Sequence, residues 1–431
     1  MNYYSLGNTK ITASFKEAVI AGIAPDKGLY FPEKISPLPK SFFDTIEDLS
    51  EHEIAFQAIH QFVKDDIPEA VLREILSIVL DFEFPVVELE PQLGTLELFH
   101  GPTMAFKDVG ARFMAQCLGY FSKNTPKEKV TVLVATSGDT GGAVANGFLG
   151  VAGVDVVILY PSGKVSDIQE KQLTTLGKNI RALEVEGTFD DCQKMVKQAF
   201  LDKSITSSKK LTSANSINVA RWLPQLFYFL FAFKHVKSKG KELVFSVPSG
   251  NFGNICAGMV AQQLGMPVHH FVAATNSNDT VPQFMETRHY SPKPSIATIS
   301  NAMDVGDPSN FIRIRQLYSN NFEKLSQNLS SFSFDEVSTK RAMKTVHQKT
   351  GYVMDPHGAV GFLGLKKYMA KNSNAYGVFL ETAHPIKFLP VVQETLGISL
   401  AVPPKIEKVL HKEKRAVKIS SYKELKEYLI A

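Results

Sequence analysis

The sequence predicts an α/β fold in which parallel strands are covered by helices on both faces. Short, continuously apolar runs rich in β-branched residues recur along the chain and alternate with stretches of helical periodicity. Strands that are apolar on both faces are typical of parallel sheets buried between helices. Two of these runs also end in turns rich in small residues. The predicted strands are residues 130–135, 154–160, 180–185, 243–247, 268–274 and 376–380.

The first 85 residues predict a mixed region without a catalytic constellation. Residues 28–32 (GLYFP) are typical of a turn followed by a short extended piece. Residues 51–63 and 68–79 carry apolar side chains at helical spacing, and the second stretch begins with proline and acid, as helices do.

Beyond residue 130, helices are expected between the strands, at about 166–176 and 189–201. The most apolar run, 226–233 (LFYFLFAF), is far shorter than the about 20 residues that span a bilayer, so it predicts a buried helix. Residues from about 276 to 350 predict an irregular region, either an insertion or a third subdomain. The lysine-rich stretch 405–418 predicts a solvated helix or tail.

Composition excludes several classes of protein. The 431 residues are 44% hydrophobic and 21% charged, which is ordinary for globular proteins and unlike disordered or collagenous chains. The net charge of +4 offers no basic excess for nucleic acid or a membrane surface. Cys117, Cys192 and Cys256 are odd in number and widely spaced, which argues against disulfides and a zinc ribbon. The start lacks a signal-peptide profile, so we expect a cytoplasmic protein.

Two strand-to-helix turns are candidate anion sites. Residues 136–143 (TSGDTGGA) follow the strand 130–135, and residues 248–254 (PSGNFGN) follow the strand 243–247. Ligands of parallel sheets bind beyond the carboxyl ends of strands, where backbone N–H groups and helix N-termini attract anions. Either turn alone could be an ordinary tight connection. Two on one sheet edge favour a binding function.

Familiar nucleotide and metal motifs are absent from the sequence. No two of the 28 glycines are separated by one residue, which excludes G-x-G-x-x-G, and no Gly-Lys pair continues into Ser or Thr as a P-loop requires. His52-Glu53 lacks the second histidine of a zinc protease, and we expect no metal. Two anion cradles without a dinucleotide indicate a monophosphate cofactor and an anionic substrate.

Such a cofactor calls for a reactive lysine, and Lys107 is the candidate. It lies in residues 101–108 (GPTMAFKD), an otherwise small and apolar setting. Desolvation lowers the pKa of a lysine, and the neutral amine forms Schiff bases. The alternative is a surface lysine that precedes a helix.

Two further places could contact ligands. Asn215, Asn218 and Arg221 recur at a spacing of three, and an arginine beside a helix N-terminus suits a phosphate. Thr382 follows the strand 376–380, where a hydroxyl could meet a ring nitrogen. The alternatives are a helix cap with a surface arginine and an ordinary polar strand end.

Together these segments resemble the threonine synthase family, pyridoxal-phosphate enzymes of fold type II in the tryptophan synthase β-like superfamily. The resemblance runs in order from about residue 3 to residue 390. It is carried by GLYFP and by residues 96–108 (LELFHGPTMAFKD), 135–143 (ATSGDTGGA), 215–221 (NSINVAR), 247–254 (VPSGNFGN), 300–310 (SNAMDVGDPSN) and 382–388 (TAHPIKF).

The resemblance implies a role for each candidate residue. Lys107 would hold pyridoxal 5'-phosphate covalently and then move protons, and Thr382 would bond the pyridine nitrogen. The cofactor phosphate would lie on Gly250, Asn251, Phe252, Gly253 and Asn254. The substrate carboxylate would lie on Ser137, Gly138, Asp139 and Thr140. The substrate phosphate would lie on Asn218 and Arg221, with Asn215 nearby.

The implied enzyme is a carbon–oxygen lyase that converts O-phospho-L-homoserine and water to L-threonine and phosphate, the last step of threonine biosynthesis. Phosphate would leave by γ-elimination, and water would then add at Cβ. The implied fold has two α/β domains of parallel sheets flanked by helices, at about 86–240 (with the Schiff-base lysine) and 241–431 (with the cofactor phosphate site), after an N-terminal region 1–85. The domains could interleave. A monomer or homodimer without nucleic-acid or membrane partners is expected.

Some residues depart from the family pattern, and other functions stay open. Glu381 stands where Gly or Ala is expected; it could raise the proton affinity of the pyridine nitrogen or point to solvent. Ile386 replaces a smaller residue, and Lys164 is a further possible anion contact. The alternative enzyme is a threonine or serine dehydratase, whose substrate carries no phosphate. The alternative from another class is a non-catalytic relative that binds a phosphorylated ligand.

Overall fold

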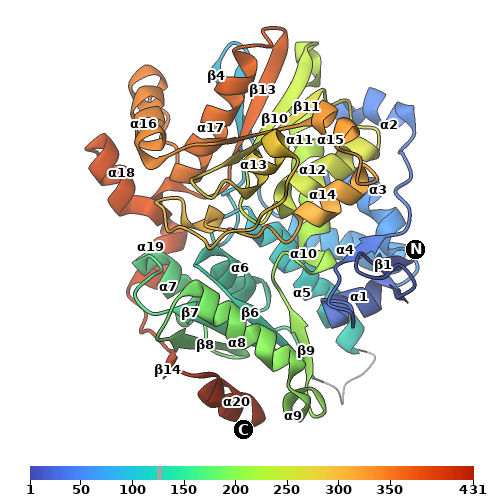
Figure 1. The fold of residues 1–431 in the computed structure, drawn as a ribbon, viewed down its shortest axis with the longest axis vertical. Helices are drawn as coiled ribbons and strands as arrows, with labels where there is room; N and C mark the ends of the chain where they lie inside the picture. The colour runs from blue at the N-terminus through green and yellow to red at the C-terminus, as the bar shows by residue number, and fades with distance from the viewer. Residues whose placement is uncertain (124–128) are drawn as a thin grey trace.

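The computed structural model describes residues 1–123 and 129–431 and contains two open sheets, one in each half of the molecule (Figure 1). The lower sheet has the order β14-β8-β7-β6-β9 and the upper sheet the order β12-β11-β10-β13-β5-β4. Helices lie on the faces of both sheets, as the alternating pattern predicts.

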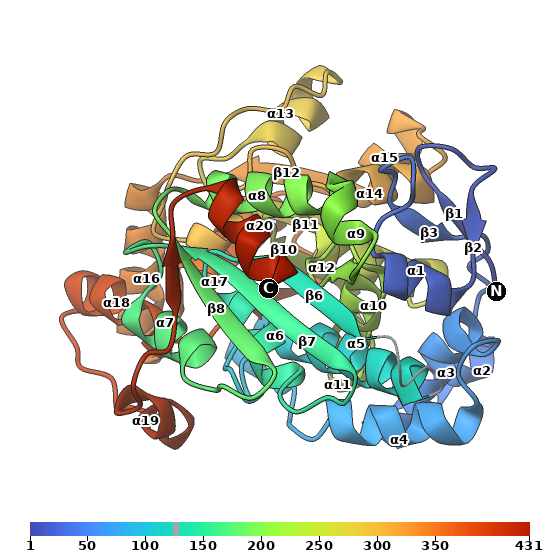
Figure 2. The same ribbon diagram turned by 90° about the horizontal axis from the view of Figure 1, so that it is seen from below.

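The lower sheet is parallel throughout. Its strands are β6 (Val130–Ala135), β7 (Val154–Pro161), β8 (Ile180–Val185), β9 (Lys210–Ser213) and β14 (Val417–Ile419). Helices α5 (Lys107–Lys123) and α6 (Asp139–Gly147) pack against β7 on one face. Helices α8 (Phe189–Leu201) and α20 (Tyr422–Ile430) lie together on the other face, which Figure 2 views from below.

The upper sheet is parallel except for its edge strand β4, which runs antiparallel to β5. Its strands are β4 (Val86–Glu90), β5 (Leu93–Glu97), β10 (Glu242–Pro248), β11 (His270–Thr275), β12 (Leu329–Ser333) and β13 (Ala375–Glu381). Helix α17 (Pro356–Met369) covers β10, β11 and β13. Phe229 of α11 (Leu226–Val236) packs edge-to-face against Phe245 and Phe271 of the sheet, beside α12 (Gly253–Gln263).

The N-terminal region forms a small antiparallel sheet and four helices at one side of the molecule (Figure 1). Its helices α3 (Glu51–Val63) and α4 (Glu69–Val79) confirm the two predicted stretches. The strand β3 (Tyr30–Pro32) contains most of GLYFP. The other elements are β1 (Tyr3–Ser5), β2 (Thr12–Ala13), α1 (Phe15–Ala21) and α2 (Lys40–Asp44).

The expectation of an irregular insertion at 276–350 is wrong over most of that range. Only about 288–310 lacks regular helices and strands, apart from a single 3-10 turn. The rest contains α13 (Thr280–Thr287), α14 (Phe311–Leu317), α15 (Phe322–Asn328), β12 and α16 (Glu336–Thr350). Helix α16 buries only Thr339, Ala342, Met343 and Val346, so its apolar stripe is too narrow to stand out in the sequence.

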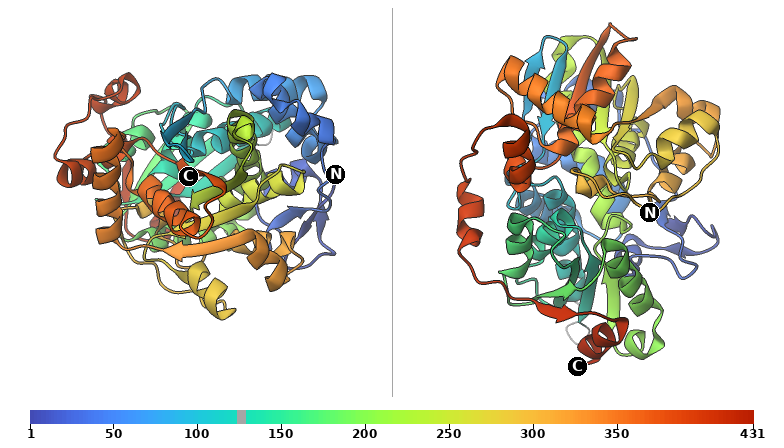
Figure 3. Two further views of the ribbon diagram at one scale, coloured as in Figure 1. Left: turned by 90° about the horizontal axis from the view of Figure 1, so that it is seen from above. Right: turned by 60° about the vertical axis from the view of Figure 1, so that its left-hand side comes forward.

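Strand pairing crosses the expected domain boundaries in two places. Residues 86–97 form β4 and β5, which belong to the sheet of residues 242–381. The chain also leaves the upper half after α18 (Leu389–Leu396), passes down one side and returns to the lower sheet as β14 (Figure 3). The lysine-rich stretch 405–418 is therefore not a free tail, because it ends in a sheet edge.

The apolar run 226–233 is fully inside the protein, which confirms the predicted buried helix. No helix in residues 1–123 and 129–431 has both the length and the apolar character needed to cross a bilayer. The remaining helices are α7 (Asp167–Thr174), α9 (Lys203–Thr206), α10 (Val219–Trp222) and α19 (Pro404–Leu410).

Candidate active site

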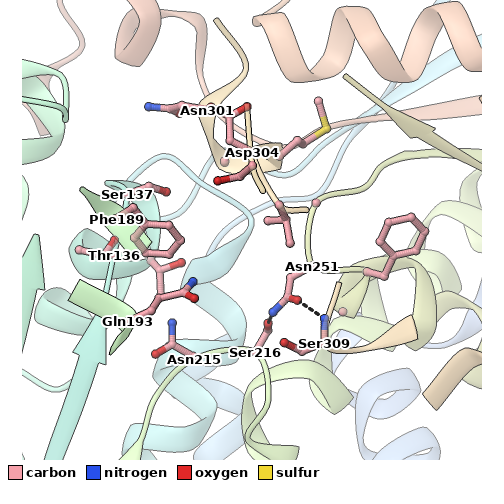
Figure 4. Close-up of a pocket in the computed structure, with 18 of the residues that line it drawn as sticks. Thr136, Ser137, Phe189, Gln193, Asn215, Ser216, Asn251, Asn301, Asp304 and Ser309 are labelled. Atoms are coloured by element: carbon pink, nitrogen blue, oxygen red, sulfur yellow. Dashed lines mark hydrogen bonds between the residues drawn. The ribbon is translucent and has the colours of Figure 1, made fainter. Parts of the chain in front are cut away.

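The carboxyl ends of β6, β10 and β13 meet at a pocket of about 300 Å³. The turn after each strand contributes to its lining, and Lys107 lies among them. In Figure 4, Thr136, Ser137 and Phe189 face Asn251 and its neighbours across the cavity, with Asp304 between them. The pocket therefore lies between the two sheets, where ligands of parallel sheets bind.

Lys107 and Thr382 come together because their segments are joined by an isolated antiparallel bridge between Ala105 and Ala383. The Phe106 N–H donates to Thr382 O over 2.9 Å, and the His384 N–H donates to Met104 O over 3.1 Å. The hydroxyl of Tyr228 donates to Phe106 O and holds the same segment from behind. Lys107 is thus the first residue of α5, and both Lys107 and Thr382 line the pocket, as expected.

The surroundings of Lys107 destabilise the charged form of its amine. Burial lowers the pKa of Lys107 to about 8, and the charges of Lys387 and Arg221 add to this effect while Asp139 opposes it. An amine with a pKa near 8 is a far better nucleophile at neutral pH than an ordinary lysine. The structure favours this reading over that of a surface lysine.

This pKa leads to a pH prediction. The rate at which the cofactor-free protein forms a reducible bond with pyridoxal phosphate should rise about tenfold per pH unit below pH 8, because only the neutral amine reacts. Above pH 8 the rate should level off. Borohydride trapping followed by peptide mass spectrometry would measure it. A rate still rising tenfold per unit at pH 10 would contradict the predicted environment.

The turn after β10 forms a cradle for an anion. Helix α12 begins at Gly253, and its N-cap residue Phe252 has φ 59°, so the chain turns sharply before the helix. The N-cap residue itself makes no side-chain capping bond, while Asn254 Oδ1 accepts from the Ile255 N–H over 2.9 Å. Gly250, Asn251, Phe252, Gly253 and Asn254 all line the pocket. Their N–H groups and the partial positive charge of the helix end suit a phosphate.

The side chains of this turn hold the backbone rather than compete for the anion. The Asn251 amide donates to Ser216 Oγ over 2.6 Å and accepts from the Ser309 N–H over 2.6 Å (Figure 4). Asn254 donates to Pro248 O over 2.9 Å. The cradle is therefore shaped before any ligand arrives.

Gly250 has no room for a side chain. A Cβ there would lie 2.7 Å from Ala302 O and 2.8 Å from Met303 Cα, both backbone atoms of the neighbouring loop. We expect Gly250→Ala to weaken pyridoxal-phosphate binding by about 1–3 kcal/mol, since the cradle or the loop must shift. Equilibrium titration of the cofactor measures this. Gly119→Ala, in α5 away from the pocket lining, is the control and should bind normally.

The turn after β6 is the second cradle. Thr136 Oγ1 accepts from the N–H groups of Gly138 and Gly141 over 2.9 and 2.8 Å and so sets the turn. The N-cap residue of α6, Gly138, makes no side-chain capping bond, and Thr136 binds the first turn of the helix through the Gly141 N–H. Ser137 and Thr140 line the pocket, as expected.

Gly138 and Asp139 do not line the pocket, contrary to expectation. A Cβ at Gly138 would lie 2.4 Å from the Gln169 side chain. The Asp139 carboxylate is turned inward, where Lys387 Nζ lies 2.6 Å from its Oδ1 and Gln169 Nε2 donates to it over 2.9 Å. These two residues therefore shape the turn. The Asp139 carboxylate is already paired with Lys387 and Gln169, so it is not a group that would bind the substrate carboxylate.

The cluster of Asn215, Asn218 and Arg221 is split by the fold. Asn215 and Arg221 line the pocket. Asn218 does not: it is fully buried as the N-cap of α10, and its amide donates to Val19 O and Ser213 O. Asn218 thus holds the loop that presents its two neighbours.

Arg221 has spare capacity for an anion. It is only 2% exposed, and its guanidinium donates to Ala214 O. Within the described residues its Nε finds no acceptor. Burial lowers the pKa of Arg221 to about 10, but it stays charged at neutral pH. A buried cation with an unused donor beside a cavity is suited to a phosphate.

Two of the lining residues that the sequence did not indicate as site residues, His357 and Asp304, organise the loop beside Gly250. His357, at the start of α17, accepts from the Ala302 N–H through Nε2 over 3.2 Å, while its Nδ1 lies 2.5 Å from Asp355 Oδ1. Asp304 binds Thr298 and Asn276 and so organises the loop beside Gly250; burial raises its pKa to about 6. Neither belongs to a periodic pattern. The signal for Asp304 was its place in the segment 300–310, and the signal for His357 was the Asp355-Pro356-His357 helix start.

Glu381 and Lys164 lie outside the pocket lining. Glu381 is fully buried beside Gly358, and the Asp355 N–H donates to its Oε2 over 3.3 Å, so the alternative that it points to solvent is wrong. Burial and the nearby Asp355 carboxylate raise the pKa of Glu381 well above its usual range. Lys164 is exposed.

The loops behind the pocket are joined by Arg313 of α14, which is fully buried. Its guanidinium donates to Tyr30 O in the N-terminal sheet, to Ser216 O and Ile217 O before α10, and to Asn310 Oδ1. It also stacks over the Trp222 ring at 4.8 Å. Three segments far apart in the sequence thus meet at one cation.

Comparison with known proteins identifies this arrangement. Three family models match: "Threonine synthase N terminus" over residues 2–78, "Pyridoxal-phosphate dependent enzyme" over 88–380 and "Threonine synthase, C-terminal" over 358–429. Threonine synthase from Escherichia coli is 42% identical over 407 residues, which cover 94% of each chain.

The chain belongs to the threonine synthase family.

Two solved structures of the family extend the likeness to the fold. The crystal structure of the Escherichia coli threonine synthase superposes with a TM-score of 0.94 at 40% identity, over 100% of this chain and 99% of that one. The structure of threonine synthase from Brucella melitensis with bound pyridoxal phosphate has a TM-score of 0.93 at 31% identity, with the same coverage. The chain is therefore a pyridoxal-phosphate-dependent enzyme of threonine biosynthesis with the type II fold, which confirms the predicted fold class and cofactor.

The pocket fits the cofactor of this family. Pyridoxal phosphate needs an amine for its aldehyde, an anion cradle for its phosphate and a polar partner for its ring nitrogen. Lys107 has an amine of lowered pKa, the N-terminus of α12 provides the cradle, and Thr382 supplies a hydroxyl at the end of β13.

Proposed function

We propose that the protein converts O-phospho-L-homoserine and water to L-threonine and phosphate. One observation carries the proposal: a single pocket combines a half-buried lysine with two helix N-termini whose N-cap residues make no side-chain capping bond, and with a buried arginine that has an unused donor. A cofactor with one phosphate and a substrate with an anion at each end would satisfy all these groups.

Under this proposal the cofactor is held by Lys107, by the turn of Gly250, Asn251, Phe252, Gly253 and Asn254, and by Thr382. When bound, pyridoxal phosphate supplies an electron sink for charge that develops on the substrate carbons. The neutral hydroxyl of Thr382 accepts or donates a hydrogen bond at the ring nitrogen without imposing a charge. Glu381 faces away, toward Asp355.

Lys107 moves the protons. Its amine takes a proton from Cα of the substrate, and further proton removal at Cβ allows phosphate to leave from Cγ. Because the pKa of Lys107 is about 8, the amine can both accept and return a proton near neutral pH. A proton then returns to Cγ, the hydroxyl of water adds at Cβ and a proton returns to Cα, while the departing phosphate takes up the third proton, so the product is threonine.

The two substrate ends are held by different helices. The N-terminus of α6, with Ser137 and Thr140, binds the carboxylate, and Arg221 with Asn215 binds the phosphate. Gly138, Asp139 and Asn218 act indirectly, since they set the backbone of these segments. Clamping both ends orients the reacting carbons.

Phosphate release tests this proposal. The purified protein with pyridoxal phosphate should release inorganic phosphate from O-phospho-L-homoserine and form threonine. It should release little ammonia from L-threonine or L-serine, which a dehydratase would consume. Ammonia without phosphate release would favour the dehydratase, and neither product would favour a non-catalytic binding protein.

Arg221→Ala separates the two anion sites. Loss of a buried charged partner should raise KM for O-phospho-L-homoserine about 10- to 100-fold, since a hydrogen bond to a charged group contributes about 1.5–3 kcal/mol. The affinity for pyridoxal phosphate should change little. Steady-state kinetics and cofactor titration measure the two effects. Loss of cofactor with an unchanged KM would mean that the two phosphate assignments are exchanged.

We further propose a cytoplasmic monomer or homodimer that needs no nucleic acid or membrane. In support, Cys117, Cys192 and Cys256 are all buried and unpaired. Light scattering of the purified protein gives the oligomeric state.

A further inference from the structure

A lysine from the last of the matching segments is buried beside the site. Lys387 follows β13 in the turn Pro385–Phe388 and has no exposed surface. Its Nζ lies 2.6 Å from Asp139 Oδ1 and donates to Thr103 O over 3.0 Å. Asp139 follows β6 and opens α6. The ion pair therefore connects the end of a strand in the upper sheet to a helix of the lower one.

Asp139 places a negative charge beside the proposed anion site, and Lys387 neutralises that charge. Asp139 is the first residue of the helix whose N-terminus faces the pocket. A free carboxylate there would repel an anionic substrate group, and in a poorly hydrated site that repulsion is strong. With Lys387 in contact, the pair has no net charge. Burial alone would raise the pKa of Asp139, but the attraction of Lys387 and Lys107 outweighs it and holds that pKa well below its usual range.

The same pair acts on the reactive lysine. Asp139, Lys387 and Arg221 are the charged groups whose fields reach Lys107. Lys387 is in turn faced by Asp108 of α5 and by His384 of its own segment. Asp108 is occupied by the Thr103 N–H and hydroxyl over 2.9 and 2.5 Å, which leaves Asp139 as the carboxylate in contact with Lys387.

We propose that Lys387 is a positioning residue of the active site: by neutralising Asp139 it keeps the N-terminus of α6 receptive to the substrate carboxylate and makes the Lys107 ammonium easier to deprotonate. This inference rests on the proposed function for the identity of the substrate carboxylate. The effect of the Lys387 charge on Lys107 does not depend on which substrate is bound.

Two single variants should shift Lys107 in opposite directions. In Lys387→Met, Asp139 is left unpaired near Lys107, so protonation of Lys107 becomes easier; in Asp139→Asn, the cation of Lys387 is left unpaired, so protonation becomes harder. We expect the pH midpoint of Lys107 labelling to rise by about one unit in the first variant and to fall by about one unit in the second. The double variant should return close to the parent protein.

Competitive labelling of the full-length, cofactor-free protein with acetic anhydride over a pH series measures this midpoint by peptide mass spectrometry. It needs neither substrate nor turnover. Failure of the proposed reaction would therefore leave this test intact. Lys387→Arg should retain the parent midpoint, because the charge remains.

Kinetics of the holoenzyme test the second half of the proposal. The measurement is made at pH 9, where most of the Lys107 in the parent protein would be neutral. Lys387→Met should raise KM for O-phospho-L-homoserine about tenfold or more, and kcat should fall by a smaller factor. In the double variant, KM should return most of the way to the parent value. A purely structural role for Lys387 would lower thermal stability in both variants without these opposite and compensating changes.

Lys414→Met is the matched control. Lys414 Nζ lies 2.9 Å from Glu184 Oε2, whose side chain is 6% exposed, and neither residue lines the pocket. Breaking this pair should leave the Lys107 midpoint and KM unchanged. The proposal would be overturned if the Lys107 midpoint shifted in the same direction in Lys387→Met and Asp139→Asn. It would also be overturned if the midpoint of the double variant lay as far from the parent value as that of either single variant. If Lys387→Met fails to fold, the downward shift in Asp139→Asn and its reversal in the double variant still decide the question.

Discussion

Replacing Lys107 with alanine should abolish turnover while the protein stays folded and still binds pyridoxal phosphate without a covalent bond. Lys107 is the group proposed both to hold the cofactor and to move protons, and loss of a general acid–base alone typically lowers a rate by about 10²–10⁴. Because the phosphate cradle after β10 is built from residues 250–254, it remains in place.

Other lysines at the pocket are poorly placed to substitute. Lys293 is bonded to Asp279 Oδ1 over 3.0 Å, and Lys197 is an exposed residue of α8. We therefore expect phosphate release from O-phospho-L-homoserine to fall by at least about 10³-fold in Lys107→Ala.

The readouts are phosphate release, cofactor absorbance and mass spectrometry after borohydride reduction. Lys164→Ala is the matched control, because Lys164 is exposed and lies outside the pocket lining. This variant should have the activity of the parent protein, and borohydride should fix the cofactor on Lys107 as in the parent. Retention of an adduct in Lys107→Ala, located on another lysine, would show that the attachment site is wrong.

Replacing Arg313 with methionine should cost several kcal/mol of folding free energy. The guanidinium makes five hydrogen bonds to four acceptors, three of them backbone carbonyls from two separate segments. Each buried acceptor left without a donor costs about 1–3 kcal/mol, and a typical protein has only about 5–15 kcal/mol to lose.

The charge of Arg313 is also unusual. In residues 1–123 and 129–431 no carboxylate pairs with it, and burial lowers its pKa to about 9. Its hydrogen bonds and the stacked Trp222 ring therefore stabilise the cation in place of a counter-ion. Lysine has three donors in a different geometry, so Arg313→Lys should recover only part of the stability.

Urea unfolding of the cofactor-free protein measures these differences. Arg288→Met is the control, because Arg288 forms an exposed ion pair with Glu323 and also stacks on a ring, Phe322. Its free energy of unfolding should change by less than about 1 kcal/mol. A loss in Arg313→Met no larger than in Arg288→Met would contradict the view that Arg313 joins the three segments.

Local elements could be read from short-range patterns. The strand 130–135 and the helices 51–63 and 189–201 have the predicted bounds, because a continuous apolar run or a helical stripe is a property of neighbouring residues. Helix α16 was missed because its buried stripe contains a threonine and an alanine among many charges. The pairing of strands was harder to predict from the sequence. Strand β14, for example, joins the lower sheet through only three residues in a lysine-rich stretch.

In the site, the residues predicted for the cofactor all line one pocket, whereas those predicted for the substrate are divided. Ser137, Thr140, Asn215 and Arg221 reach the pocket, but Gly138, Asp139 and Asn218 turn into the protein. A motif specifies which residues are near one another along the chain and leaves open which side chain faces the cavity.

The amino-acid sequence alone determined the alternation of strands and helices, the small residues that allow tight turns at strand ends, and the family to which they belong. Only the tertiary structure decided that Lys387 meets Asp139 at 2.6 Å, that His357 holds the loop over Gly250, and that Arg313 links segments from three parts of the chain. These contacts join residues that can be hundreds of positions apart, and their energies arise from burial and desolvation that exist only once the two sheets have come together.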